Sequence, residues 1–159
     1  MFIDFLKREW KISCLGCAIA NGIIEPPYGL IYQSNHLVVH QDPLVPLKGF
    51  IILASKRHIK SINQMTSDEY REYCDLVKKI RASYPESDNF EGLTFIQEEI
   101  SSHFHIWFFP WYTGMRQKEI PALNQIRDLS EKYCHIGSSI QNLREIEEFV
   151  LLLQTRLNE

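Results

Sequence analysis

The chain has 159 residues, of which 45% are apolar, 12% aromatic and 23% charged, and its formal net charge is −3. This balance is typical of one globular domain and excludes a wholly disordered chain, which combines low hydrophobicity with high net charge. Apolar runs such as Gly49–Ala54 are far shorter than the roughly 18 residues of a membrane span. The 17 basic residues form no broad cationic face beside 20 acidic ones, so we expect neither nucleic-acid nor membrane partners.

The N-terminal residues Met1–Ser13 mix aromatic with charged side chains, whereas the core of a secretory signal is an uninterrupted apolar run. We therefore read them as a short amphipathic lead-in and expect a cytoplasmic protein. In that compartment a disulfide framework is not expected for the four cysteines, which are Cys14, Cys17, Cys74 and Cys134.

The next part of the chain reads as short strands separated by turns. Gly22–Gly29 holds two prolines and is a turn region. Leu30–Tyr32 and His36–Gln41 are predicted strands that meet at a Gln-Ser-Asn turn. Asp42–Lys48 is a loop, and the continuous apolar run Gly49–Ser55 predicts a buried strand.

The central part predicts one helix and two further strands. Thr66–Tyr84 begins with a capping hydroxyl and acidic residues and ends before Pro85, which is helix chemistry. Thr94–Gln97 and His103–Phe109 are the predicted strands. Strands, a helix, strands and then helices, without regular alternation, predict an α+β domain with a largely antiparallel sheet.

The residues after Pro121 are predicted to be helical. Ser138-Ser-Ile-Gln141 fits a capping box at a helix start. Apolar residues then recur by three and four, which predicts a seam packed on the domain, with a dimer contact as the alternative. The seam consists of Leu143, Ile146, Val150, Leu153 and Leu157.

The most informative stretch is the predicted strand around two histidines. Because side chains alternate along a strand, His103, His105 and Trp107 share one face and the residues between them form an apolar face. A strand with imidazole side chains on one face and apolar side chains on the other is suited to an active site on a sheet. The alternatives are two structural histidines or a chance surface pair.

Cys14 and Cys17 form a C-x-x-C pair without a second such pair. A tetrahedral zinc ion would need two more ligands, for which His58 and His103 are the natural candidates. The alternatives are a reduced buried pair and a redox pair. Other residues have no partner that the pattern identifies: Cys74, Cys134, His36, His40 and His135, with Trp111 and Tyr112 open between pocket and core.

The order of these segments resembles the histidine-triad (HIT) superfamily of nucleotide hydrolases and transferases. Cys14–Ile24 is similar to the opening C-x-x-C and short helix, Leu30–His40 to a hairpin, and Gly49–His58 to a strand that ends in Lys-Arg-His. A long helix and His103–Pro110 complete the pattern. The resemblance covers about residues 14–112, so we expect a single domain, 1–159, in which 113–159 is a helical extension.

The register of the triad follows from counting back from Pro110. Two apolar residues precede the proline, which makes Trp107 the third position, His105 the middle histidine and His103 the first. The alternative register takes Ser101 as first and His105 as third, and it leaves two surplus residues before the proline.

The resemblance implies a role for each of these positions. His105 is implied as the nucleophile that forms a nucleotidyl-histidine for water to cleave, and Asp42 as the group that holds the ribose hydroxyls. Cys14, Cys17, His58 and His103 are implied ligands of a structural zinc ion; no catalytic metal or organic cofactor is expected. The base and sugar pocket is implied to be lined by Leu15, Ile19, Gln41 and Pro43.

The chain also departs from the family pattern. Trp107 replaces the third histidine, although its indole N–H remains a hydrogen-bond donor. Gln97–Ser102 replaces a glycine-containing stretch; Ser101 and Ser102 offer hydroxyls to a phosphate, and the two glutamates there are read as solvated.

We expect a homodimeric hydrolase of nucleoside phosphoanhydrides or phosphoramidates, such as dinucleoside polyphosphates. A zinc-stabilised module that binds nucleotides without catalysis is the main alternative, and a redox protein is another.

Overall fold

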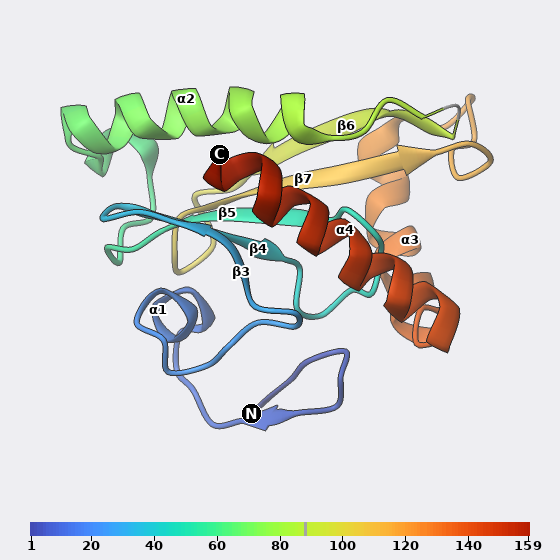
Figure 1. Ribbon diagram of the computed structural model, residues 1–159, viewed down its shortest axis with the longest axis horizontal. Helices are drawn as coiled ribbons and strands as arrows, with labels where there is room; N and C mark the ends of the chain where they lie inside the picture. Colours follow the sequence, from blue (N-terminus) through green and yellow to red (C-terminus); the bar gives the residue numbers. More distant parts are fainter. Residues whose placement is uncertain (88) are drawn as a thin grey trace.

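The computed structural model describes residues 1–87 and 89–159 and contains a five-stranded antiparallel sheet (Figure 1). The strands lie in the order β3-β4-β5-β7-β6, and each pair of neighbours is antiparallel. The predicted α+β class is therefore confirmed. The strands are β3 (Leu30–Gln33), β4 (Leu37–Gln41), β5 (Ile51–Ser55), β6 (Phe90–Gln97) and β7 (His105–Tyr112).

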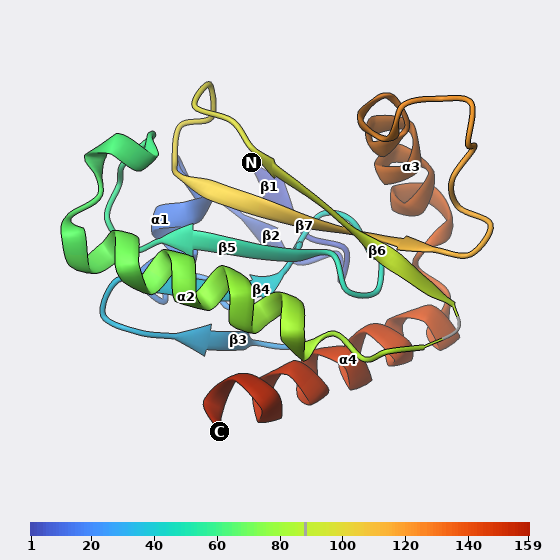
Figure 2. The ribbon, with the colours of Figure 1, turned by 90° about the horizontal axis from the view of Figure 1, so that it is seen from above.

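Helices cover both faces of the sheet. In Figures 1 and 2, α2 (Ser67–Ser83) and α4 (Ile140–Asn158) lie on one face, and α1 (Leu15–Ala20) lies on the other. The second face also carries α3 (Ala122–Ile136) and a two-stranded ribbon where the sequence predicted only a lead-in. The remaining elements are β1 (Phe2–Ile3), β2 (Glu9–Trp10) and the short helix η1 (Ile62–Gln64). Within residues 1–87 and 89–159, no helix combines the length and apolarity needed to cross a membrane.

Side chains of β7 alternate between the two apolar cores as predicted. Ile106 and Phe108 lie in the core beneath α2 and α4, whereas Trp107 and Phe109 belong to the core on the α1 face. Phe104, just before the strand, packs edge-on against Tyr73 of α2, with ring centroids 5.6 Å apart. The strand thus presents one face to the α1 side of the sheet.

The predicted start of this strand, however, is wrong. His103 lies in a bend, and β7 begins only at His105 and runs on to Tyr112. The N–H of Phe104 donates to the carbonyl of Ile59 at 2.6 Å, so a loop holds the chain there in place of a strand. His103 lies outside the ladder, yet its ring is still on the α1 side of the sheet, 3.5 Å from the sulfurs of Cys14 and Cys17.

Helix α2 begins at Ser67 with Thr66 as its cap, as the capping chemistry predicts. Thr66 and Glu69 form a capping box, and Glu69 also accepts two hydrogen bonds from the guanidinium of Arg57, at 2.6 and 2.7 Å. The Arg57 contact is the largest cause that holds the pKa of Glu69 down at about 2. This pair ties the loop after β5, which carries His58, to the start of α2.

The helix start predicted at Ser138–Gln141 is wrong by one residue. Ser139 is the cap, and its hydroxyl accepts from the N–H of Asn142 at 3.2 Å. The side-chain amide of Asn142 donates to the carbonyls of Pro46 and Gly137. It therefore does not bond the backbone N–H of the cap, as a capping box requires. A Cβ on Gly137 would lie 2.5 Å from Pro46, which fixes a glycine at this turn.

The predicted apolar seam of α4 packs on its own domain. Ile146, Val150 and Leu153 are fully buried in the core beside α2 and β3. At the edge of the sheet, the side-chain amides of Gln154 and Asn158 donate to β3 carbonyls at 2.9 and 3.0 Å. Helix α4 therefore contributes side chains to the hydrophobic core and also covers the free edge of β3.

Candidate functional site

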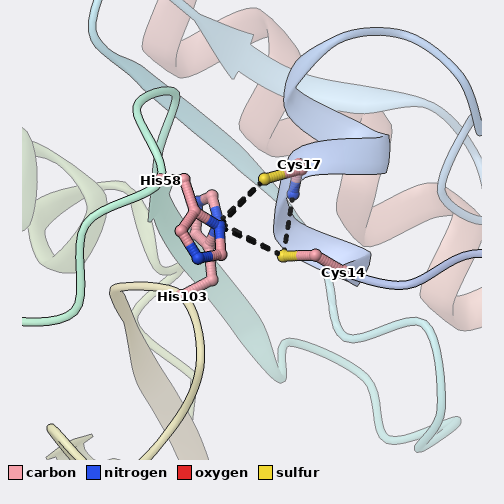
Figure 3. Close-up of side chains that lie close together, drawn as sticks. All are labelled: Cys14, Cys17, His58 and His103. Carbon is pink, nitrogen blue, oxygen red and sulfur yellow. Dashed lines mark hydrogen bonds between the residues drawn. The ribbon is translucent and has the colours of Figure 1, made fainter.

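Four metal-ligating side chains from three separate segments meet beside the first turn of α1. Cys14 caps this helix and Cys17 lies one turn later, so both thiols face the same side (Figure 3). His58 comes from the loop after β5 and His103 from the bend before β7. All four ligand atoms lie within 4.8 Å of one another. The structure thus assembles the four residues predicted as zinc ligands.

Distances within this cluster fit a tetrahedral zinc ion. The Nδ1 atom of His103 lies 3.5 Å from each cysteine sulfur, and Nδ1 of His58 lies 3.6 and 3.1 Å from the same atoms. Zinc bonds of about 2.3 Å to sulfur and about 2.0 Å to nitrogen at tetrahedral angles set sulfur–nitrogen separations of about 3.5 Å. The residues present therefore fit structural zinc.

Neighbouring groups fix the orientation of the buried ligand, His103. Its Nε2 lies 2.6 Å from the carbonyl of Ser55, which can only accept, so Nε2 carries the proton and Nδ1 offers its lone pair to the cluster. Burial lowers the pKa of His103, which favours this neutral form. A Cβ on Gly16 would lie 2.5 Å from the ring, so the second of the two residues between the cysteines must be glycine for the ring to fit.

A cavity of about 190 Å³ opens next to the cluster, over the α1 face of the sheet. Its walls are mostly apolar, with a few polar groups, and no lysine or arginine is among them. Nine predicted site residues border it: Leu15, Ile19, Asp42, Pro43, Ser101, Ser102, His103, His105 and Trp107. A larger cavity of about 670 Å³ lies at the opposite end of the sheet, against α4, and holds none of them.

His105 is held in one tautomer at the edge of this cavity. Its Nδ1 lies 2.8 Å from the carbonyl of His103 and must donate, so in the neutral ring Nε2 carries the lone pair. Nε2 has no protein partner in the described part of the chain. The ring lies 6.3 Å from that of Trp107, tilted by 35°. The site therefore presents an available imidazole nitrogen.

Ser101 and Ser102, which precede His103, differ in exposure and in hydrogen bonding. The Ser101 hydroxyl donates to the carbonyls of Glu98 and His103, each at 3.1 Å, so its proton is already engaged. Ser102 is exposed at the rim of the cavity. Of the two, Ser102 is the better placed donor for a ligand.

Asp42 is a buried carboxyl group at the other side of the cavity. Its Oδ1 accepts from the N–H groups of Leu44 and Val45, each at 2.8 Å, which shapes the loop after β4. Burial raises the pKa of Asp42 to about 6, although these two donors oppose the rise. The second oxygen, Oδ2, has no hydrogen-bond partner in residues 1–87 and 89–159, so it remains open to a ligand.

Removing the charge of Asp42 should stabilise the fold at neutral pH. Because the folded chain holds this proton more tightly, the carboxyl group favours folding at low pH, and that contribution is lost as pH rises from 3.8 through about 6. Asp42→Asn keeps an acceptor oxygen for the loop. In urea denaturation it should exceed the wild type by about 1–3 kcal/mol at pH 8. The difference should shrink towards zero near pH 4.

The matched control is Asp42→Ala, which removes the acceptor as well as the charge. It should be less stable than Asp42→Asn at every pH, since two buried N–H groups lose their partner. Equal stability of Asp42→Asn and the wild type at pH 8 would contradict a desolvated carboxylate.

One predicted site residue lies elsewhere, and one site residue was not predicted. Gln41 is fully buried and donates to the carbonyl of Leu47 at 2.8 Å; it does not border the cavity. The expectation that Gln41 lines the pocket is thus wrong, because neighbouring strand residues face opposite ways. His40, by contrast, borders the cavity. Alternation along the strand from Asp42 is the signal that could have found it.

Comparison with known proteins connects this geometry to a family. No family model matches the sequence. An uncharacterised HIT-like protein of Methanocaldococcus jannaschii is 27% identical over 111 residues, which cover 64% of this chain and 81% of that protein. Among solved structures, a zinc-bound histidine triad family protein from Mycobacterium smegmatis has a TM-score of 0.54 and 17% identity, over 79% of this chain and 93% of that one.

Two further structures share the fold. A member of the HIT family from Bacillus subtilis has a TM-score of 0.55 and 18% identity over 76% of this chain and 94% of its own. A hypothetical histidine triad nucleotide-binding protein from Sulfolobus tokodaii has a TM-score of 0.51 and 18% identity over 87% and 92%. The chain is therefore similar in sequence to a HIT-like protein and has the fold of these histidine triad structures, and its Cys14, Cys17, His58 and His103 form a possible zinc site.

Proposed function

We propose that the chain hydrolyses nucleoside phosphoanhydrides or phosphoramidates through a nucleotidyl-histidine on His105. One observation carries the proposal: the His103 carbonyl fixes the proton of His105 on Nδ1, which leaves the lone pair of Nε2 in the cavity. A neutral imidazole at pH 7 is nucleophilic and is also a good leaving group from phosphorus once it is protonated.

The proposed reaction has two displacements at the α-phosphorus. In the first, Nε2 of His105 forms a bond to phosphorus, and the bond to the leaving oxygen or nitrogen breaks; the leaving group takes a proton from solvent. In the second, water attacks phosphorus and releases a proton to solvent, the P–N bond breaks, and its electron pair returns to Nε2. The Nδ1–H group donates to the His103 carbonyl throughout and stabilises the positive charge on the ring.

Other residues of the cavity have supporting roles in this proposal. The open oxygen of Asp42 accepts from ribose hydroxyls, and the apolar side chains of Leu15 and Ile19 contact the base. The indole N–H of Trp107 and the hydroxyl of Ser102 donate to phosphate oxygens. Zinc held by the cysteine–histidine cluster supplies only rigidity, because it cross-links α1 to the segments that flank the cavity.

A nucleotide-binding module without catalysis is the second candidate. It is favoured by one observation, namely that neither lysine nor arginine borders the cavity. Transition-state charge on the phosphate would then be met by neutral donors alone, which lowers the rate that this site can reach.

A substrate panel separates the two candidates. We expect diadenosine tetraphosphate or adenosine 5′-phosphoramidate to be hydrolysed to products that include AMP. With a stereochemically labelled α-phosphorus, two displacements should give net retention of configuration, whereas direct attack by water should give inversion. AMP binding without any hydrolysis would support the module, and no binding of any nucleotide would rule out both.

A further inference from the structure

His40 on β4 is a buried histidine with an unused acceptor atom aimed at the cavity. It is 3% exposed and borders the cavity together with His105. Its Nδ1 lies 2.8 Å from the carbonyl of Gln41. A carbonyl oxygen only accepts, so Nδ1 carries the proton and Nε2 keeps its lone pair.

The ring stays neutral over the working pH range, which fixes this tautomer. Burial is the main cause that lowers the pKa of His40 to about 4, and nearby His105 adds to it. No side chain or backbone group in the described part of the chain donates to Nε2. This acceptor on the cavity wall is therefore open to a donor from a ligand, and a hydrogen bond formed in such a largely apolar site contributes to affinity.

The strand register places this acceptor in the part of the cavity suited to a base. His40 pairs with Ile52 on β5, which pairs with Trp107 on β7. His105 lies in the next row, paired with Ala54, so the Cα atoms of the two histidines are about 12 Å apart by strand geometry. A phosphate held at His105 is therefore out of reach of His40. The neighbours of His40 in its row, Leu30 and Ile52, are apolar, as the walls of a base pocket are.

A nucleotide offers two kinds of donor to such an acceptor: its ribose hydroxyls and the N–H groups of its base. The open carboxylate oxygen of Asp42 is the stronger acceptor for the hydroxyls, since it is charged above pH 6. The base is left for the neutral imidazole nitrogen of His40.

We propose that His40 is a specificity-determining residue that reads an exocyclic amino group of the base through Nε2. The site then prefers amino bases, such as adenine and cytosine, to their oxo counterparts hypoxanthine and uracil. An oxo base places a second acceptor against Nε2, so the lone pairs oppose each other and both lose their hydrogen bond. This inference rests on the proposed function, because it assigns the base end of the same cavity.

The test compares matched nucleotides with matched variants. Binding of AMP, IMP, CMP and UMP is measured by calorimetry at pH 7.5 for the wild type, His40→Phe and His40→Gln. Phenylalanine fills the apolar row without an acceptor, and glutamine can place a carbonyl oxygen near the position of Nε2. Zinc content and thermal unfolding of each variant show whether its fold is intact.

We expect the wild type to prefer AMP to IMP, and CMP to UMP, by about 10-fold or more. In His40→Phe both preferences should fall to within about twofold, and His40→Gln should restore at least one of them. Retained preferences in a folded His40→Phe, or equal losses for amino and oxo nucleotides, would overturn the role of His40. Failure of the wild type to bind any of the four nucleotides would instead overturn the proposed function.

Discussion

Replacing His105 by glycine is expected to lower hydrolysis of adenosine 5′-phosphoramidate by at least about 10³-fold, because the other free imidazole nitrogen of the cavity, on His40, lies two strands away from the position of His105. Imidazole added to the solution should restore part of the activity, since the deleted ring leaves a space beside the His103 carbonyl that once oriented it. Glycine is chosen over alanine to leave room for the added base.

The matched control is His135→Gly, an exposed histidine of α3 far along the chain from the site. It should keep wild-type turnover and show no response to imidazole. Rapid alkaline quench of the wild type should trap a phosphorus–nitrogen adduct that is stable in base and acid-labile, and mass spectrometry should place it on the peptide containing His105. Full activity in His105→Gly would assign the chemistry to another group.

The sequence predicted best those features of the helices that depend only on neighbouring residues. The Thr66–Glu69 capping box lies within four consecutive residues and marks the start of α2 to within one residue. The apolar seam of α4 predicted its buried face, since helical periodicity depends only on the helix itself. The start of α4 could not be placed as well, because it depends on the contact of Gly137 with Pro46, more than ninety residues earlier.

The site shows the same division between local and distant causes. Alternation along β7 put His105 and Trp107 on one face, and the structure brings both to the cavity. The rule also put His103 on that face, and His103 borders the same cavity, but the predicted strand start was wrong because the Ile59 carbonyl takes the Phe104 N–H. His40 had no visible partner in the sequence because its relevance depends on strand register, which pairs β4 with β5 and β5 with β7.

One residue links the metal cluster to the proposed nucleophile. The His103 side chain points into the cluster, whereas its carbonyl accepts from Nδ1 of His105 at 2.8 Å and from the Ser101 hydroxyl at 3.1 Å. A His103 side chain that is held rigidly in the cluster also fixes the position of its own carbonyl. That carbonyl accepts the hydrogen bond that sets the tautomer of His105. Loss of the cluster should therefore weaken both stability and turnover, although its four side chains have no step in the proposed reaction.

Cys17→Ser is the sharpest test of that link. We expect the zinc bound per chain to fall from about one to near zero and the free energy of unfolding to fall by about 3 kcal/mol or more, because a structural zinc site contributes its binding energy to folding. At a temperature where the variant is still folded, kcat should fall more than about tenfold while KM changes less, since the ring of His105 loses its fixed orientation.

Gly16→Ala reaches the same cluster without removing a ligand. The added methyl group would lie 2.5 Å from the His103 ring, so that ring must leave its place, and zinc content and kcat should fall together. Cys74→Ser, on the exposed side of α2, is the matched control and should change neither. If Cys17→Ser loses zinc but keeps the wild-type kcat, the coupling through His103 is wrong. If Cys17→Ser keeps both its zinc and its stability, the cluster is not a metal site. Oxidation of Cys14 and Cys17 to a disulfide in the wild type would then support a redox pair.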